Sequence, residues 1–194
     1  MADRIPKTYT FEEQYKPQFE SLVRERNYNN IILSVPSNAK EAICFLIKRG
    51  FNANGVILVI SPYKKRINYE VQYLKDLGLT ATTIIEDTSI PDRDDIYATF
   101  SEEFFYCTPE MIENGFREVR SFINYLLDSK ICTVIFEEAE LITYTRRTSF
   151  QFLRNVRERY PNVQWIALTD ASVQGIEHIA SSLSMENYEI IEME

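Results

Sequence analysis

The sequence has few cysteines, a single histidine and no long apolar run. Its three cysteines, Cys44, Cys107 and Cys132, lie in or beside short apolar runs, without the pairing of a disulfide framework or the spacing of a zinc site. The N-terminal segment MADRIPKTYTFEEQ has no apolar signal core, and no stretch reaches the about 18 consecutive apolar residues that span a bilayer. These absences argue against a secreted disulfide-stapled domain, a zinc module and a membrane protein, so we expect reduced core thiols in a nuclear or cytoplasmic chain.

Basic residues are also in deficit. The 21 Lys and Arg face 29 Asp and Glu, which gives a net charge of -8 and a field that repels polyanions, so any nucleic-acid contact must be local. The single His178 has no carboxylate or cysteine at catalytic spacing. The 194 residues are 45% apolar, enough for one sizeable core, and no repeat or glycine-rich linker divides them. We therefore expect one domain over residues 1–194.

Short runs of branched and aromatic residues alternate along the chain with longer stretches of helical period. This pattern predicts an α/β fold with a mostly parallel sheet flanked by helices on both faces. The expected strands are residues 30–35, 56–61, 81–86, 104–107, 132–137, 163–169 and 188–191. The expected helices are residues 17–26, 39–49, 64–77, 109–130, 150–160 and 173–183, and Asn114 and Gly115 leave open whether the fourth is one helix or two.

Several segments stand in the order and spacing of the first RecA-like lobe of RecQ-type, superfamily 2, helicases. Gln18, ahead of the strand IILSVP, resembles the adenine-reading glutamine region, and VILVISPYKKRINYEVQYLKDLGLTA and FFYCTPEMI resemble motifs Ia and Ib. The Asp-Glu-Ala-His box of motif II is resembled by TVIFEEAE, and motif III with its preceding helix by FQFLRNVRERYPNVQWIALTDAS. The resemblance covers nearly the whole chain. It implies a RecA-like P-loop NTPase fold and a single lobe, the second lobe being absent.

The phosphate loop departs from the family pattern. A working member reads Pro-Thr-Gly-x-Gly-Lys-Ser, whose backbone N–H groups, lysine and hydroxyl hold phosphate and magnesium. Aligned on the following ICF, the chain has Glu41 at the lysine position and Ala42 at the hydroxyl position, within a loop that contains Ser37, Asn38 and Lys40. A carboxylate close to a triphosphate repels it. We therefore expect no nucleotide cofactor; the alternative is a loop shifted by one residue, with Lys40 on the phosphate.

Motif II departs as well. The family needs an acid for magnesium, an acid for the attacking water and a histidine that couples hydrolysis to movement. The chain has Glu137, Glu138 and Glu140 at these positions, and together with Glu41 they predict four carboxylates around one cavity. Mutual repulsion should raise some of their pKa values or attract a cation. We expect a solvated acidic cleft rather than a metal site.

Two short basic segments are candidate nucleic-acid contacts. The triplet KKR follows Ser-Pro at the turn where the family touches the DNA backbone, and the loop LITYTRRTS stands in place of the family's aromatic-rich DNA-sensing loop. A basic triplet at the start of a helix is usually a solvated face, and it neutralises at most about three phosphates. An exposed loop is likewise the simpler interpretation of the second segment. The candidates are Lys64, Lys65, Arg66, Thr108, Tyr144, Arg146 and Arg147.

These departures predict a catalytically inactive helicase-like domain, a pseudohelicase, rather than an enzyme. We expect it to act as a protein-binding adaptor or regulatory subunit, covered by a protein partner or by a second copy of the chain. The resemblance favours the nucleus over the cytoplasm. A weak nucleic-acid-binding module and a residual ATP binder remain as alternatives.

Overall fold

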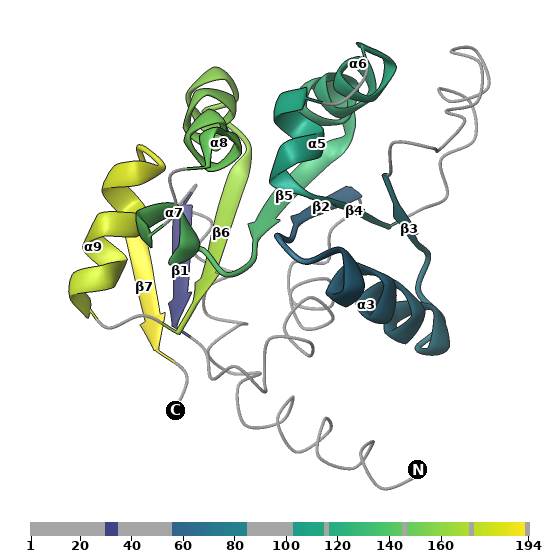
Figure 1. Cartoon of the computed structure of the whole chain (residues 1–194), viewed down its shortest axis with the longest axis horizontal. Helices are drawn as coiled ribbons and strands as arrows, with labels where there is room; N and C mark the ends of the chain where they lie inside the picture. The colour runs from purple at the N-terminus through teal and green to yellow at the C-terminus, as the bar shows by residue number, and fades with distance from the viewer. Residues whose placement is uncertain are drawn as a thin grey trace, which may run out of the picture.

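The sheet is the framework of the molecule. The computed structural model describes residues 30–34, 56–84, 103–114, 117–144, 147–170 and 173–192. They form a seven-stranded sheet in the order β3-β4-β2-β5-β6-β1-β7, in which every pair of neighbours is parallel (Figure 1). The strands are β1 (Asn30–Ser34), β2 (Val56–Ile60), β3 (Ala81–Thr83), β4 (Phe104–Cys107), β5 (Ile131–Phe136), β6 (Gln164–Thr169) and β7 (Tyr188–Glu192). All seven predicted strands are present, and the predicted α/β class is confirmed.

Helices fill the connections between the strands. They are α3 (Lys64–Asp76), α5 (Pro109–Asn114), α6 (Arg117–Tyr125), the π-helical turn η1 (Leu126–Lys130), α7 (Leu141–Tyr144), α8 (Thr148–Arg159) and α9 (Val173–Ser182). The predicted helix at 109–130 is divided after Asn114, and the short α7 was not predicted. The predicted helices at 17–26 and 39–49 lie outside the described residues. No helix in the described part of the chain is long and apolar enough to cross a membrane.

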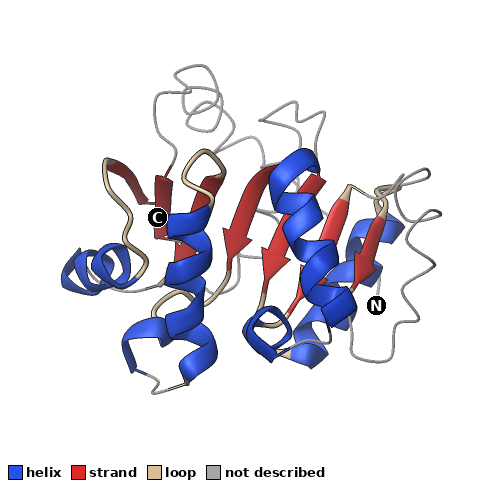
Figure 2. Ribbon diagram, turned by 90° about the horizontal axis from the view of Figure 1, so that it is seen from above, coloured by secondary structure: helices blue, strands red, loops and turns tan. Residues whose placement is uncertain are grey.

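The direction of travel across the sheet decides which face each helix covers. A connection between parallel strands is almost always right-handed, so connections that run in opposite directions place their helices on opposite faces. From β2 to β3 the chain moves toward one edge, whereas from β4 to β5, β5 to β6 and β6 to β7 it moves toward the other. Accordingly, α3 packs on one face and α5, α6, α8 and α9 on the other, and Figure 2 shows helices on both sides of the strands. The predicted double covering is confirmed.

The strands supply alternate side chains to two cores. In β2, Val56, Leu58 and Ile60 join the core under α5, α6, α8 and α9, while Ile57 and Val59 join the core under α3. The other central strands alternate in the same way because successive side chains of a strand point to opposite faces. A strand buried on both faces must be apolar throughout, which explains the runs that predicted these strands.

Helix α3 is held against its core by residues one helical turn apart. Ile67, Val71 and Leu74 are buried there at i, i+4 and i+7, and Glu70 is buried on the same side. The helix ends before Gly78, whose positive φ of 80° is the left-handed conformation that glycine adopts without strain. The helix predicted at 64–77 is confirmed, and the orientation of α3 brings Glu70 into the protein interior.

A buried polar contact ties β1 to α8 and to the turn before β7. The Asn30 amide oxygen accepts a hydrogen bond from Arg157 Nε at 2.9 Å, and its Nδ2 donates to the carbonyl of Glu186 at 2.7 Å. Asn30 is 2% exposed and Arg157 7% exposed. Burial lowers the pKa of Arg157, which the charge of Glu186 partly offsets. Asn30 therefore satisfies the buried donor of Arg157 and the carbonyl of Glu186.

We predict that Asn30→Ala lowers the free energy of unfolding by about 1–3 kcal/mol, because the Arg157 donor and the Glu186 carbonyl lose their partner inside the protein. Urea unfolding of the wild type and the variant measures the difference. The matched control is Asn68→Ala, the same change at an exposed position of α3. An Asn30→Ala variant no less stable than this control would contradict the prediction.

Candidate functional site

The candidate site lies at the edge of the sheet where the strands end. In a parallel α/β sheet the carboxyl ends of the strands share one edge, and ligands bind there. Ser61 follows β2, Thr108 follows β4 and Glu137 follows β5, and all three are buried. Because β4, β2 and β5 are neighbours in the sheet, these polar residues lie along one stretch of its edge.

Arg66 is surrounded by three carboxylates at this edge. Its Nε lies 2.5 Å from Glu70 Oε1 and 3.8 Å from Glu137 Oε2, and its Nη1 lies 2.7 Å from Glu138 Oε1. Glu70 comes from one turn further along α3, whereas Glu137 and Glu138 come from the loop after β5. We call these four residues the Arg66 cluster. The cluster joins α3 to the segment that resembles motif II.

The backbone of the loop after β5 directs Glu138 toward Arg66. Glu137 N–H donates to the carbonyl of Ile60 at 2.9 Å, which continues the sheet by one residue. Glu138 then adopts a positive φ of 50°, a conformation that residues other than glycine rarely adopt. Such conformations persist only where the surrounding structure holds them. Here the bond from Arg66 Nη1 to the Glu138 carboxylate is one such contact.

Glu137 is the most deeply buried member of the Arg66 cluster, at 0% exposure. Burial raises its pKa well above the usual range, the nearby Glu70 carboxylate raises it further, and Arg66 and the Ser61 hydroxyl lower it only in part. Burial and the Glu70 carboxylate therefore both favour the protonated form of Glu137. A carboxyl pKa at motif II is raised, as predicted, but burial rather than repulsion is the largest cause, and the repelling carboxylate is Glu70 rather than a member of the predicted group.

The charge of Arg66 is fixed by the same contacts. Burial opposes the charged guanidinium, but the carboxylates of Glu137, Glu70 and Glu138 outweigh this effect and raise the pKa of Arg66. The three carboxylates around the guanidinium thus hold Arg66 in its charged form.

The membership of the acidic group differs from the prediction. Glu140 does not join Arg66; its carboxylate accepts a hydrogen bond from Thr169 Oγ1 at 2.7 Å, at the end of β6. Glu41, the fourth predicted member, lies outside the described residues. In the described part of the chain the acidic residues around Arg66 are Glu70, Glu137 and Glu138, and no group of three or more His, Cys, Asp or Glu side chains there is arranged to hold a metal ion.

Glu70 was missed by the sequence analysis, although the sequence carries a signal for it. The residue lies three positions after Ile67 and one before Val71, inside the apolar stripe of α3. It also stands four residues after Arg66, the spacing of a helical ion pair. A carboxylate within an apolar stripe needs a partner in the protein interior. The spacing alone does not show that this partner is shared with motif II.

The structure places some of the candidate nucleic-acid contacts on the surface and others in the interior. Lys64 and Lys65 are exposed at the start of α3, but Arg66 turns inward to the Arg66 cluster and leaves two of the three basic side chains on the surface. Tyr144 is 74% exposed at the end of α7, whereas Thr108 is only 4% exposed. Arg147 is exposed before α8, with Nη1 3.7 Å from Glu110 Oε1.

The predicted nucleotide-loop residues and one loop arginine lie outside the described part of the chain. They are Gln18, Ser37, Asn38, Lys40, Glu41 and Arg146.

The chain is similar to helicases in sequence and in fold, and no protein-family model matches it. It is 23% identical to RecQ-like DNA helicase blm-1 of Caenorhabditis elegans over 198 residues, which cover 96% of the chain and 20% of that protein. It is 24% identical to RecQ-like DNA helicase BLM of Xenopus laevis over 168 residues, 82% of the chain and 12% of that protein. The chain thus spans a fifth or less of the length of these relatives.

Two solved structures share the fold. The Pyrococcus furiosus Hef helicase domain has a TM-score of 0.62 and 18% identity, over 94% of this chain and 39% of that one. The DUF1998 helicase MrfA bound to DNA has a TM-score of 0.65 and 12% identity, over 96% of this chain and 27% of that one. The chain is therefore a helicase-like domain with an α/β, RecA-like fold. Within that class its sequence resembles the RecQ-like helicases, as the ordered segments predicted.

We predict that Glu137→Gln stabilises the protein increasingly as pH rises. Below the ordinary glutamate pKa both folded and unfolded chains are protonated at residue 137, so the substitution changes little. Above it residue 137 ionises in the unfolded chain but stays protonated in the folded chain. The wild type therefore loses stability as pH rises, until the pH passes the raised pKa of Glu137 in the folded protein. A gain of about 1 kcal/mol, or about 2–4 °C in Tm for a domain of this size, is expected by pH 8.

Thermal melts of the wild type and the variant between pH 5 and pH 8 measure this difference. The matched control is Glu177→Gln, the same change at an exposed position of α9. A wild type that becomes the more stable of the two as pH rises would show that Glu137 is ionised in the folded protein.

Proposed function

We propose that the chain is a catalytically inactive helicase-like domain that serves as a protein-binding adaptor or regulatory subunit. The observation that carries this proposal is the Arg66 cluster. Arg66 lies 3.8 Å from Glu137, at the position that the resemblance assigns to the magnesium ligand. It also binds Glu138 at 2.7 Å, at the position of the acid for the attacking water. A guanidinium therefore stands where the chemistry needs a divalent cation.

The Arg66 cluster does not suit a magnesium nucleotide. Magnesium requires ionised oxygen ligands in octahedral geometry and usually keeps several of its waters. Glu137 is fully buried with a raised pKa, and a cation beside it would meet the positive charge of Arg66. Releasing Arg66 would leave Glu70 and Glu138 without their ion pair at a partly buried edge. The ion pair thus competes with the metal for the same carboxylates.

Sequence and exposure add support to the adaptor role. The loop that resembles a phosphate loop has Glu41 and Ala42 at the lysine and hydroxyl positions. Tyr63, which follows β2, is 49% exposed, and Tyr144, which follows β5, is 74% exposed. The strands β2 and β5 are neighbours in the sheet. Exposed tyrosines are frequent anchors of protein interfaces. A partner or a second copy of the chain would cover this edge, and the resemblance to RecQ-like helicases favours a nuclear setting.

The two alternatives rest on separate features. A weak nucleic-acid-binding module would use Lys64 and Lys65, which are exposed on α3. A residual ATP binder would need Arg66 to leave Glu138 when nucleotide arrives. The net charge of -8 opposes the first, and the burial of Glu137 opposes the second.

We predict no magnesium-dependent ATP turnover above a protein-free blank, with or without single-stranded DNA. Millimolar ATP and magnesium should also leave the Tm unchanged, whereas a micromolar ATP binder would gain about 5 °C or more. Phosphate release and thermal shift measure the two effects. Turnover or a Tm shift that disappears in Glu138→Gln would overturn the proposal of an inactive site. Turnover that persists in this variant would identify a contaminating enzyme.

We predict only weak, non-specific binding of single-stranded oligonucleotides. Two exposed lysines on a chain of net charge -8 release few counterions, so binding should vanish between about 50 and 200 mM salt. Fluorescence anisotropy with a labelled oligonucleotide measures the affinity. Submicromolar binding at physiological salt, abolished in Lys64→Glu/Lys65→Glu and retained in Lys75→Glu, would favour the nucleic-acid-binding module instead.

A further inference from the structure

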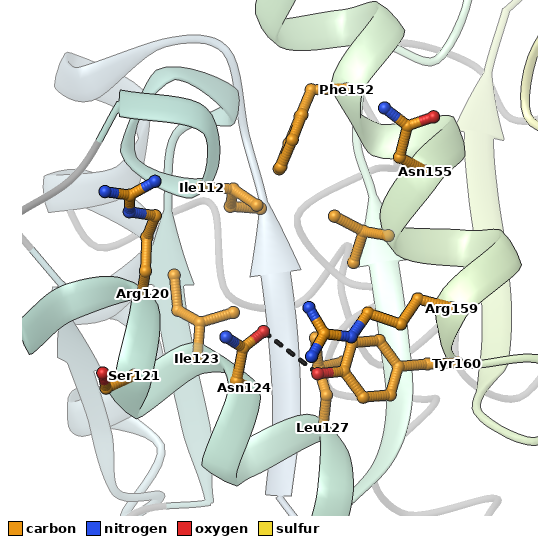
Figure 3. A pocket seen from close by; sticks show the side chains of 11 residues that line it. Ile112, Arg120, Ser121, Ile123, Asn124, Leu127, Phe152, Asn155, Arg159 and Tyr160 are labelled. Carbon is orange, nitrogen blue, oxygen red and sulfur yellow. Dashed lines mark hydrogen bonds between the residues drawn. The ribbon is translucent and has the colours of Figure 1, made fainter. Parts of the chain in front are cut away.

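A groove lies between α6 and α8, on the face of the sheet opposite α3. The cavity has a volume of about 430 Å³, and its floor consists of the core residues Ile112, Ile123, Leu127 and Val156 (Figure 3). These side chains are buried beneath it, and Phe152 is only partly buried beside them. We call this cavity the α6–α8 groove. Its volume lies in the range of ligand sites in proteins and is large enough for apolar side chains of a partner.

One end of the α6–α8 groove is fixed by a contact between its two walls. The Tyr160 hydroxyl donates a hydrogen bond to Asn124 Oδ1 at 3.0 Å, which joins the end of α8 to α6 (Figure 3). Tyr160 lies just before β6 and Leu127 just before β5, so this end is at the amino ends of the strands. The groove is therefore formed without a ligand, which reduces the entropy lost on binding. It also lies away from the Arg66 cluster at the carboxyl ends.

The charge of the α6–α8 groove is opposite to that of the chain. Arg120 and Arg159 lie on its two sides, and the described residues that line it include no Asp or Glu (Figure 3). The whole chain has a net charge of -8. Within the described part of the chain neither arginine forms an ion pair, although Arg159 lies 5.5 Å from the centre of the Tyr160 ring. Two guanidinium groups thus stand at the rim of an apolar floor.

We propose that the α6–α8 groove binds a short acidic, amphipathic segment of a partner protein. Its apolar side chains cover Ile112, Ile123 and Val156, and its carboxylates pair with Arg120 and Arg159. Arginine forms bidentate bonds with carboxylates, and an apolar floor flanked by such anchors is the usual anatomy of a peptide site. A phosphate backbone would pair with the arginines but leave the floor uncovered. The inference rests on the proposed adaptor function and names the surface and partner chemistry for it.

The experiment selects binders of the 194-residue chain from a phage-displayed library of random 12-residue peptides. Each recovered clone is then measured against the charge-reversed variant Arg120→Glu/Arg159→Glu. The matched control is Lys64→Glu/Lys65→Glu, which changes the net charge equally but lies on α3, on the other face of the sheet. Circular dichroism confirms that both variants are folded, and Arg120→Gln/Arg159→Gln replaces the first variant if charge reversal unfolds it.

We expect clones in which Asp or Glu alternate with Phe, Leu or Ile. These clones should bind Arg120→Glu/Arg159→Glu about tenfold or more weakly than the wild type, and should bind the control variant as well as the wild type. Added salt should weaken the binding of these clones to the wild type. Failure to recover any clone that loses affinity on Arg120→Glu/Arg159→Glu would overturn the proposal. Clones that are basic or purely apolar, or an oligonucleotide that needs the two arginines, would also overturn it. ATP is absent throughout, so these results are independent of the turnover measurements that test the inactive site.

Discussion

The ion pairs of Arg66 are the constraint on which the carboxyl edge of the sheet depends. One guanidinium binds a carboxylate of its own helix and a carboxylate of the loop after β5, and it lies within 3.8 Å of a third that is fully buried. None of these carboxylates is easily left alone in the interior, since breaking a buried pair typically costs about 3–5 kcal/mol. The Arg66 cluster therefore holds α3 and the loop that resembles motif II in one arrangement, and it links the fold to the proposed loss of catalysis.

The parallel sheet keeps the two candidate surfaces apart. Because right-handed connections place α3 on one face and the later helices on the other, the Arg66 cluster and the α6–α8 groove are built from different layers. The Arg66 cluster lies at the carboxyl ends of β2 and β5, whereas the end of the α6–α8 groove that Tyr160 and Asn124 fix lies at the amino ends of β5 and β6. A partner in the groove would leave the carboxyl edge open to a second contact, as an adaptor requires.

Similarity to helicases places the domain in a class but does not assign it an activity. The relatives in sequence are RecQ-like helicases of which the chain covers 20% and 12%, and the fold neighbours are 18% and 12% identical. Function has to be argued from the site because one fold supports many activities. At this site a guanidinium, a buried acid with a raised pKa and two further acids, one of them in a left-handed turn, occupy the edge, which is the physical basis of the proposed adaptor role.

The sequence alone determined the strands, their parallel arrangement and the resemblance to a helicase lobe. Those features depend on local pattern: β2 is apolar at every position, and Gly78 follows α3 in the left-handed conformation that glycine adopts without strain. The sequence also predicted a raised carboxyl pKa at motif II, and Glu137 has one. Only the tertiary structure decided which groups surround that carboxylate. Arg66 and Glu70 stand about 70 residues before Glu137 and Glu138, and no local rule relates positions so far apart. Arg66 had been expected on the surface and Glu140 in the acidic group. The packing of α3 reversed the first expectation because a buried glutamate in its apolar stripe requires a cation beside it. Glu140 instead accepts a hydrogen bond from Thr169 at the end of β6.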